Sequence, residues 1–414
     1  MTDLYFQQTF ANGLTLVAEK MPAVQSAAMT LLVPAGSATD PAGQIGSATV
    51  LSDLVFRGAG TRDSRALSEH LDSLGLNRSS GASVYHTRFA SAAVAENVME
   101  GLAVYADIVR RPMLPQDGFE SSREMALHAI DGVEDEPRQK LLIRLREKHL
   151  PDPLGRNTMG ERKDLMALTN DRVAADFRQR YQPTGAILSL AGKIDFAEVQ
   201  QRVEQLFADW PANPAPAPLL NRAAERMFHE TQQSEQTHIG IAWDSIPETH
   251  EDYYMVRLIG EALGGGMSGR LFTEIREKRG LCYSVSAGFS SLKDLGFMMG
   301  YAGSSNDRAQ ATLDCFMDEL ARLAKGIAQD ELDRAKIALK ASTIMQGEST
   351  SSRSGAIVHD YFVRGRIRTL DEIKAAIEAV TLDRANAYLA KNVPGPFTIV
   401  TVGPKPLTLK APTL

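Results

Sequence analysis

The pattern that decides the fold begins with SAGFSSLKDLGFMMGYAG, residues 286–303, which predicts two strands joined by a tight turn. Two amphipathic helical segments follow, RAQATLDCFMDELARLA at 308–324 and DELDRAKIALKASTI at 330–344. The first half repeats this order, with GASVYHTRFASAAVA at 81–95 before helical segments that start near 97 and 119. Runs of strands followed by runs of helices predict an α+β fold with two similar domains, each a mainly antiparallel sheet covered by helices. The repeated order indicates an internal duplication.

A proline-rich stretch separates the two halves. It reads PANPAPAP at 211–218, and its alternating prolines favour an extended connector over helix or sheet. At roughly 150 residues per domain, a chain of 414 residues is expected to form two or three domains. We therefore predict an N-terminal α+β domain at 1–210, a linker at 211–218 and a C-terminal α+β domain at 219–414.

Composition and charge exclude several classes of protein. The chain is 43% hydrophobic and 23% charged, as in ordinary globular proteins, and its net charge of -6 with scattered basic residues argues against nucleic-acid binding. Two cysteines do not make a disulfide framework, which favours a reducing compartment. The N-terminus, MTDLYFQQTFANG, lacks the features of a signal peptide, and no apolar run is long enough to span a membrane. We expect a soluble, cytoplasmic protein without membrane partners.

A second stretch carries a resemblance to a known family. The segment GQIGSATVLSDLVFRGAGTRDS at 43–64 resembles the signature helix of pitrilysin/insulinase-type zinc peptidases, roughly G-x-A-H-x-L-E-H-x-x-F-x-G-T. The positions that agree are Gly46, Ala48, Leu51, Phe56 and Gly58. The preceding segments FANGLTLVAEKMP and VPAGSATDPAGQIG fit the strands and loop before that helix, and the resemblance covers almost the whole chain. It implies the half-length, two-domain type of this family.

The residues that would bind the metal are replaced. The chemistry needs two histidines one helical turn apart and a carboxylate that deprotonates the zinc-bound water. In register, Thr49 stands at the first ligand position, Ser52 at the position of the general base and Asp53 at the second ligand position. The resemblance places the third ligand, a glutamate in the family, at Ala129. We therefore expect neither a catalytic zinc nor another cofactor in this chain.

Two other patterns could suggest ligands. His70, His86 and His128 lie in the first half, but no pair has ligand spacing on one helix, so hydrogen-bonded or solvated histidines are expected. The run Gly264 to Gly269 satisfies G-x-G-x-x-G. However, the preceding YYMVRLIGEAL predicts a helix, whereas a dinucleotide-binding loop follows a strand. We therefore expect these glycines to end a helix.

The second half contains the most specific positive match. The segment EALGGGMSGRLFTEIREKRGLCYSVSAGF at 261–289 resembles the C-terminal-domain signature of the same family. The resemblance implies that Arg276 and Tyr283, seven positions apart, hold the substrate backbone and stabilise the oxyanion formed at the scissile carbonyl. Taken alone, the pair can also be interpreted as a surface ion pair and a packed aromatic ring.

The resemblance also implies a division of labour between two chains. It predicts the non-metal-binding subunit of a heterodimeric zinc metallopeptidase, inactive alone, whose Arg276 and Tyr283 face the zinc of a homologous partner. Unfolded peptides would be bound as an added strand, and the equivalent edge here, near residues 81–86, would be vestigial. Three alternatives stay open: a purely structural pseudo-peptidase subunit, an autonomous enzyme with relocated metal ligands, and a homodimer.

Overall fold

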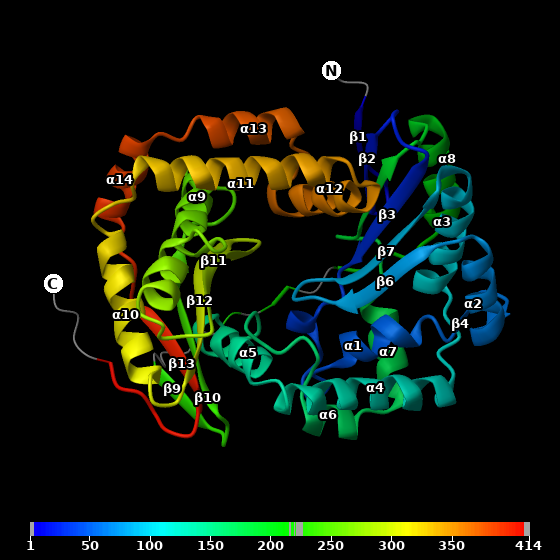
Figure 1. The fold of residues 1–414 in the computed structure, drawn as a ribbon. Coiled ribbons are helices and arrows are strands. Elements are labelled where there is room, and N and C mark those ends of the chain that lie inside the picture. The colour runs from blue at the N-terminus through cyan, green and yellow to red at the C-terminus, as the bar shows by residue number, and fades with distance from the viewer. Residues whose placement is uncertain (1–3, 215–216, 219, 221–226, 410–414) are drawn as a thin grey trace. The chain divides into compact units, whose positions relative to one another are not determined.

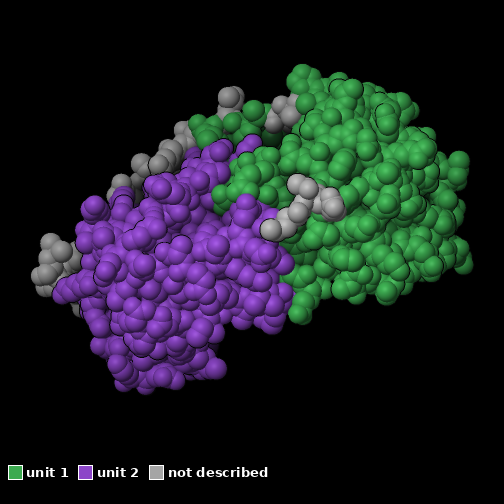
Figure 2. Space-filling view, turned by 90° about the horizontal axis from the view of Figure 1, so that it is seen from above, with its two compact units in different colours: residues 1–132, 152–221, 346–367 green, residues 133–151, 222–345, 368–414 purple. Residues whose placement is uncertain are grey.

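The computed structural model describes residues 4–214, 217–218, 220 and 227–409. Of the predicted linker at 211–218, residues 215 and 216 lie outside the described residues, and the other six form neither helix nor strand. Two compact units make up the chain, coloured separately in Figure 2. Unit 1 contains residues 1–132, 152–221 and 346–367, and unit 2 contains 133–151, 222–345 and 368–414. Each unit thus includes a segment from the other half of the sequence.

Unit 1 is built on a six-stranded sheet. Its strands, in spatial order, are β1 (Tyr5–Thr9), β2 (Thr15–Lys20), β8 (Ile187–Gly192), β3 (Ser26–Val33), β7 (Thr87–Val94) and β6 (Asn77–Ala82). Neighbours are antiparallel except β2 and β8, which run parallel. A separate two-stranded ribbon joins β4 (Gly58–Ala59) and β5 (Arg62–Asp63).

Unit 2 has a five-stranded sheet of the same topology. Its strands, in spatial order, are β11 (Ser284–Leu292), β12 (Leu295–Ser305), β10 (Gln236–Ser245), β13 (Phe397–Gly403) and β9 (Met227–Thr231). Only β13 and β9 are parallel, as β8 and β2 are in unit 1. The prediction of two similar, mainly antiparallel α+β halves is therefore confirmed.

The predicted helix pairs follow each strand pair (Figure 1). They are α3 (Ala95–Arg110) and α4 (Gln116–Glu134) in the first half, and α10 (Ala309–Leu323) and α11 (Gln329–Gly347) in the second. The other helices are η1 (Ser37–Thr39), α1 (Ser47–Leu54), α2 (Ser64–Ser73), α5 (Pro137–His149), α6 (Arg162–Ala167), α7 (Asn170–Arg180), α8 (Phe196–Phe207), α9 (Tyr253–Gly264), η2 (Phe272–Glu277), α12 (Thr350–Arg364), α13 (Leu370–Glu378) and α14 (Leu382–Lys391). None of the described helices is both long and apolar enough to cross a bilayer.

Both faces of the unit 1 sheet are buried. Along β3, Met29 and Leu31 point into the main core, whereas Leu32 points to the opposite face, because side chains alternate along a strand. On that second face Leu32 packs against Ile357 and Val358 of α12, a helix from the C-terminal half of the chain. Helix α12 packs against β3, β8 and β2, and Figure 1 shows it beside this sheet.

The unit 2 sheet is covered in the same way by α5, a helix from the N-terminal half. Leu141 and Leu145 of α5 form a small buried cluster with side chains of β10, β12 and β13. Gly240 in β10 permits close packing, since a Cβ atom there would lie 3.1 Å from Leu145 Cδ2. Each sheet therefore has its second face covered by a helix that the other half supplies.

Candidate functional site

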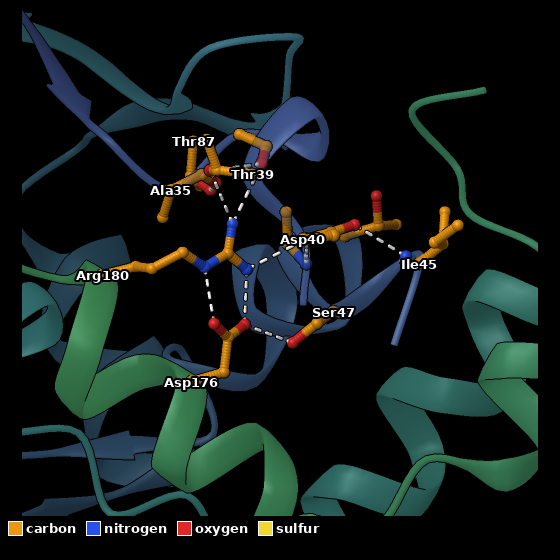
Figure 3. A network of polar contacts seen from close by, with 12 residues as sticks. Ala35, Thr39, Asp40, Ile45, Ser47, Thr87, Asp176 and Arg180 are labelled. Carbon is orange, nitrogen blue, oxygen red and sulfur yellow. Dashed lines mark hydrogen bonds and ion pairs between the residues drawn. The ribbon is translucent and has the colours of Figure 1, made fainter. Parts of the chain in front are cut away.

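Helix α1, which carries the replaced ligand positions, is anchored by a buried charge network (Figure 3). Arg180 in α7 donates from Nη2 to Asp40 Oδ1 at 3.0 Å and from Nε to Asp176 Oδ1 at 2.5 Å. Ser47, the first residue of α1, donates its hydroxyl to Asp176 Oδ2 at 2.5 Å. All four side chains are buried, so the guanidinium offsets much of the cost of desolvating the two carboxylates.

Asp40 caps the start of α1. Its Oδ2 accepts a hydrogen bond from Gly46 N at 2.7 Å, and its Oδ1 accepts one from Ala48 N at 3.0 Å. Gly46 has a φ of 112°, a conformation that favours glycine. Burial raises the pKa of Asp40 to about 6, although Arg180 and the two backbone donors act in the opposite direction. The start of helix α1, which carries the predicted ligand positions, is thus fixed by Asp40.

Thr49, at the predicted first ligand position, and Ser52, at the predicted position of the general base, both donate their hydroxyl groups to backbone carbonyls. Thr49 donates its Oγ1 to Thr158 O at 2.5 Å, and Ser52 donates its Oγ to Thr49 O at 2.8 Å. A hydroxyl that donates to a carbonyl is a poor substitute for the imidazole or carboxylate that a catalytic zinc requires.

Asp53, at the second ligand position, is engaged by a cation and a hydroxyl. Its Oδ2 accepts hydrogen bonds from Arg57 Nε at 3.0 Å, from Arg57 Nη2 at 2.8 Å and from Ser122 Oγ at 2.5 Å. Ser122 belongs to α4, and Ala129 lies two turns further along the same helix, where it is exposed. The i, i+4 spacing of Asp53 and Arg57 was a signal in the sequence that could have predicted this pair.

The described residues at these positions do not fit a catalytic zinc. They supply two committed hydroxyls, one carboxylate paired with a guanidinium, and a methyl group. Across the described part of the chain, no three His, Cys, Asp or Glu side chains gather as a metal site would require. Of the first-half histidines, His86 packs edge-on against Phe362 and His70 lies 3.2 Å from Glu100, so they do not converge.

The edge strand that the resemblance relates to peptide binding is β6, at the end of the unit 1 sheet. The turn after β6 is fastened to α12, since the rings of Tyr85 and His86 lie 5.3 and 4.6 Å from that of Phe362. The free edge of β6 thus ends in a turn packed against a helix.

Arg276 lies in an unusual helical turn in unit 2. The segment η2 is π-helical, with Lys278 N bonded to Thr273 O five residues earlier at 3.0 Å. Isolated π-turns redirect side chains and are frequent at functional sites. Gly280, with a φ of 60°, ends the turn, and its N–H bonds to Arg276 O at 3.0 Å. The π-turn leaves no signal in the sequence, because its residue pattern does not differ from that of an α-helix.

The polar ends of Arg276 and Tyr283 are both exposed. Arg276 stacks its guanidinium on the Phe272 ring at 4.7 Å, and within the described residues it has no hydrogen bond or ion pair. Tyr283 is 61% exposed, and its backbone N–H bonds to Gly303 O at 2.9 Å. Neither the surface ion pair nor the packed aromatic ring describes these two side chains. Both are presented to solvent from a backbone that is held in place.

The glycine run before η2 has the structural role expected for it. Helix α9 precedes it, and Gly265 N bonds to Glu261 O as the helix ends. Gly266 has a φ of 84° in the turn that follows. The run therefore ends a helix, as predicted.

Two duplicated α+β units, one with an altered ligand helix and the other with a free Arg/Tyr pair, define a two-domain protein of the zinc-peptidase class. A family model described as "Insulinase (Peptidase family M16)" matches residues 15–162, and one described as "Peptidase M16 inactive domain" matches residues 167–339. The chain belongs to peptidase family M16 and is of its half-length, pitrilysin-like type.

Individual relatives agree with this assignment over nearly the whole chain. An uncharacterized zinc protease of Streptomyces coelicolor is 29% identical, with 94% of this chain and 86% of the relative covered. A crystal structure of a peptidase M16 inactive domain from Pseudomonas fluorescens has a TM-score of 0.89 and 23% identity, covering 98% of this chain and 100% of that one. A protease from Helicobacter pylori has a TM-score of 0.88 and 21% identity, covering 97% and 99%. The two solved structures support the fold.

Proposed function

We propose that this chain is the zinc-free subunit of a two-chain metallopeptidase, and that it supplies Arg276 and Tyr283 to the zinc site of a homologous partner. The observation that carries the proposal is the combination of an altered ligand helix with an exposed Arg/Tyr pair. Asp53 is paired with Arg57 and Ser122, whereas the guanidinium of Arg276 has no hydrogen bond or ion pair within the described part of the chain. An exposed guanidinium held by stacking is available to a ligand from outside.

The chemistry of the pair suits peptide carbonyls. A guanidinium and a phenolic hydroxyl both donate hydrogen bonds, and an oxyanion gains more from such donors than the neutral carbonyl does. The partner's zinc would supply the activated water, which no group at positions 49, 52, 53 or 129 is suited to supply. The chain alone is therefore expected to be inactive, and the pair of chains to hydrolyse unfolded peptides.

The two thiols support a proposal for the cellular compartment. Cys282 and Cys315 are both free and buried, which suits a reducing compartment such as the cytoplasm. We include a cytoplasmic location, unfolded peptide substrates and a zinc-bearing homologous subunit in the proposal.

The test is to mix the chain with an M16 homologue that has an intact H-x-x-E-H motif, and to measure cleavage of an unstructured fluorogenic peptide. We expect cleavage only in the mixture. Arg276→Ala is expected to lower kcat/KM by on the order of 100-fold, the typical effect of losing one oxyanion donor. Tyr283→Phe removes only the hydroxyl and is expected to act in the same direction.

Arg279→Ala is the matched control. Arg279 lies in the same turn, but its guanidinium is paired with Glu274 at 2.9 Å, so its loss is expected to leave the rate unchanged. An unaltered rate with Arg276→Ala and Tyr283→Phe would contradict the proposal and favour a purely structural subunit. Cleavage by this chain alone, abolished by a chelator, would favour an autonomous enzyme.

A further inference from the structure

A buried pair of hydroxyl groups holds the backbone between Arg276 and Tyr283. The carbonyl of Leu281 accepts a hydrogen bond from Ser304 Oγ at 2.6 Å and one from Thr312 Oγ1 at 2.9 Å. The two hydroxyls lie 3.0 Å apart, and both side chains are fully buried. Ser304 comes from β12 and Thr312 from α10, so strand and helix meet at one carbonyl oxygen.

The peptide groups of Leu281 connect the two halves of the Arg/Tyr pair. Its N–H bonds to Ile275 O at 3.0 Å, within the π-turn that carries Arg276. Its C=O lies two residues before Tyr283 and is fixed by Ser304 and Thr312. Any shift of Leu281 would therefore move Arg276 and Tyr283 together.

We infer that Ser304 and Thr312 are positioning residues for Arg276 and Tyr283, and that they hold both side chains in the geometry in which a substrate carbonyl is bound. This inference rests on the proposed function of the pair. Threonine suits the task, because its β-branched side chain has few rotamers, and Thr312 Oγ1 also lies 3.0 Å from Arg308 O at the start of its own helix. The Leu281 carbonyl is partly buried, and such a carbonyl is costly to leave without a donor.

A second contact supports the same role from the surface. Arg308 donates from Nη1 to Gly280 O at 2.7 Å, one residue before Leu281. Two successive carbonyls of the loop are thus bound by side chains from the segment 304–312. The loop is fastened at its backbone, and the side chains of Arg276 and Tyr283 stay free for a ligand.

Cys282 provides a readout that does not depend on peptidase activity. It lies between Leu281 and Tyr283, and its side chain is buried. In a Cys315→Ala background it is the single thiol of the chain, so its rate of reaction with a thiol reagent measures how often the loop opens. The double variant Ser304→Ala/Thr312→Val is expected to react roughly ten times faster, since Leu281 O loses both donors.

Three variants make the labelling result specific. Thr312→Ser keeps the hydroxyl and is expected to react at the original rate. Thr312→Val alone is expected to give a smaller increase, and it replaces the double variant if that one does not fold. Ser189→Ala removes a hydroxyl from a comparable buried group in unit 1, where Ser189 Oγ lies 2.9 Å from Ser354 Oγ, and is expected to leave Cys282 unchanged.

Activity of the two-chain enzyme then tests the functional part. In the Ser304→Ala/Thr312→Val background, kcat is expected to fall. Adding Tyr283→Phe is then expected to have little further effect on kcat, because a misplaced Tyr283 hydroxyl already contributes little to oxyanion stabilisation. Unchanged labelling of Cys282 in both hydroxyl variants would overturn the inference. If Tyr283→Phe has no effect in the original chain, the proposed function fails, while the labelling still decides whether the hydroxyl pair holds the loop.

Discussion

At the scale of a residue, Asp53, which the resemblance places at the second ligand position, has a structural role in this chain. Its carboxylate binds Arg57 within the first half of the chain and Ser122 of α4, so it joins α1 to α4. The resemblance implies that a metal would join the corresponding helices in a zinc-bearing relative. In this chain the guanidinium of Arg57 neutralises the Asp53 carboxylate, and the hydroxyl of Ser122 links it to α4.

This interpretation predicts that Asp53 contributes to stability and that zinc does not. Asp53→Ala is expected to lower the free energy of unfolding by about 1 kcal/mol, a modest value because the side chains of Asp53 and Arg57 are each about a third exposed. An excess of zinc or of a chelator is expected to leave the melting temperature of the original chain unchanged, since the residues that the structure describes contain no ligand set for the metal. Thermal denaturation followed by circular dichroism measures both effects.

The control for Asp53 is Glu69→Ala. Glu69 forms an i, i+4 pair with Arg65 on the surface, with both side chains mostly exposed, so its loss is expected to have almost no effect. A zinc-dependent rise in the melting temperature of the original chain would show that our account of positions 49, 52, 53 and 129 is wrong.

At the scale of the elements, periodicity predicted the strand and helix pairs but not what α5 and α12 cover. Leu141 and Leu145 in α5 are four residues apart, and Ile357 and Val358 in α12 lie on one face. Apolar residues four apart, such as Leu141 and Leu145, predict that a helix has one buried face. This spacing does not specify which sheet that face packs against. The exchange of these helices between the halves could therefore not be predicted from the sequence and is seen only in the structure.

The direction in which the Arg276 side chain points could not be predicted from the sequence either. The residues FTEIRE at 272–277 suit an ordinary helix, and only Gly280 signals where the turn ends. Tertiary contacts lie next to the π-turn, because Leu281 bonds through its N–H to Ile275 O and through its C=O to Ser304 Oγ. The family signature identifies Arg276 as a candidate, but its stacking on Phe272 and its exposure depend on the fold of this turn.

A buried ion pair links α12 to β2. Arg353 in α12 donates from Nε to Glu19 Oε2 at 2.7 Å, and both side chains are at most 9% exposed. Arg353→Ala is expected to lower the free energy of unfolding by about 3 kcal/mol, because Glu19 would keep a buried charge without its cation. Chemical denaturation measures this loss.

Replacing both partners distinguishes a charge effect from a packing effect. Glu19→Gln/Arg353→Met is expected to regain much of the stability that Arg353→Ala loses, since no unpaired charge stays buried. Equal losses for the single and the double variant would mean that the packing of α12, and not the ion pair, sets the effect.

For the whole molecule, the duplication and the helix exchange have opposite consequences. The duplication gives each half its own sheet and its own layer of helices. The exchange leaves each half incomplete, because residues 346–367 belong to unit 1 and residues 133–151 belong to unit 2. The predicted linker at 211–218 divides the sequence into two halves, but helices α5 and α12 each pack in the unit that is built mainly from the other half.

The last prediction tests this dependence with fragments. The fragment 1–210 lacks α12 and would expose the apolar second face of its sheet, which includes Val17, Leu32 and Ile187. We expect it to aggregate or to melt well below the intact chain, and to be stabilised by a peptide of residues 346–367 added in trans, because that peptide restores the buried face. The same peptide with Arg353→Ala is the control and is expected to bind more weakly, since Glu19 is left unpaired. A fragment 1–210 that is soluble and as stable without the peptide as with it would show that the exchanged helix is dispensable for folding.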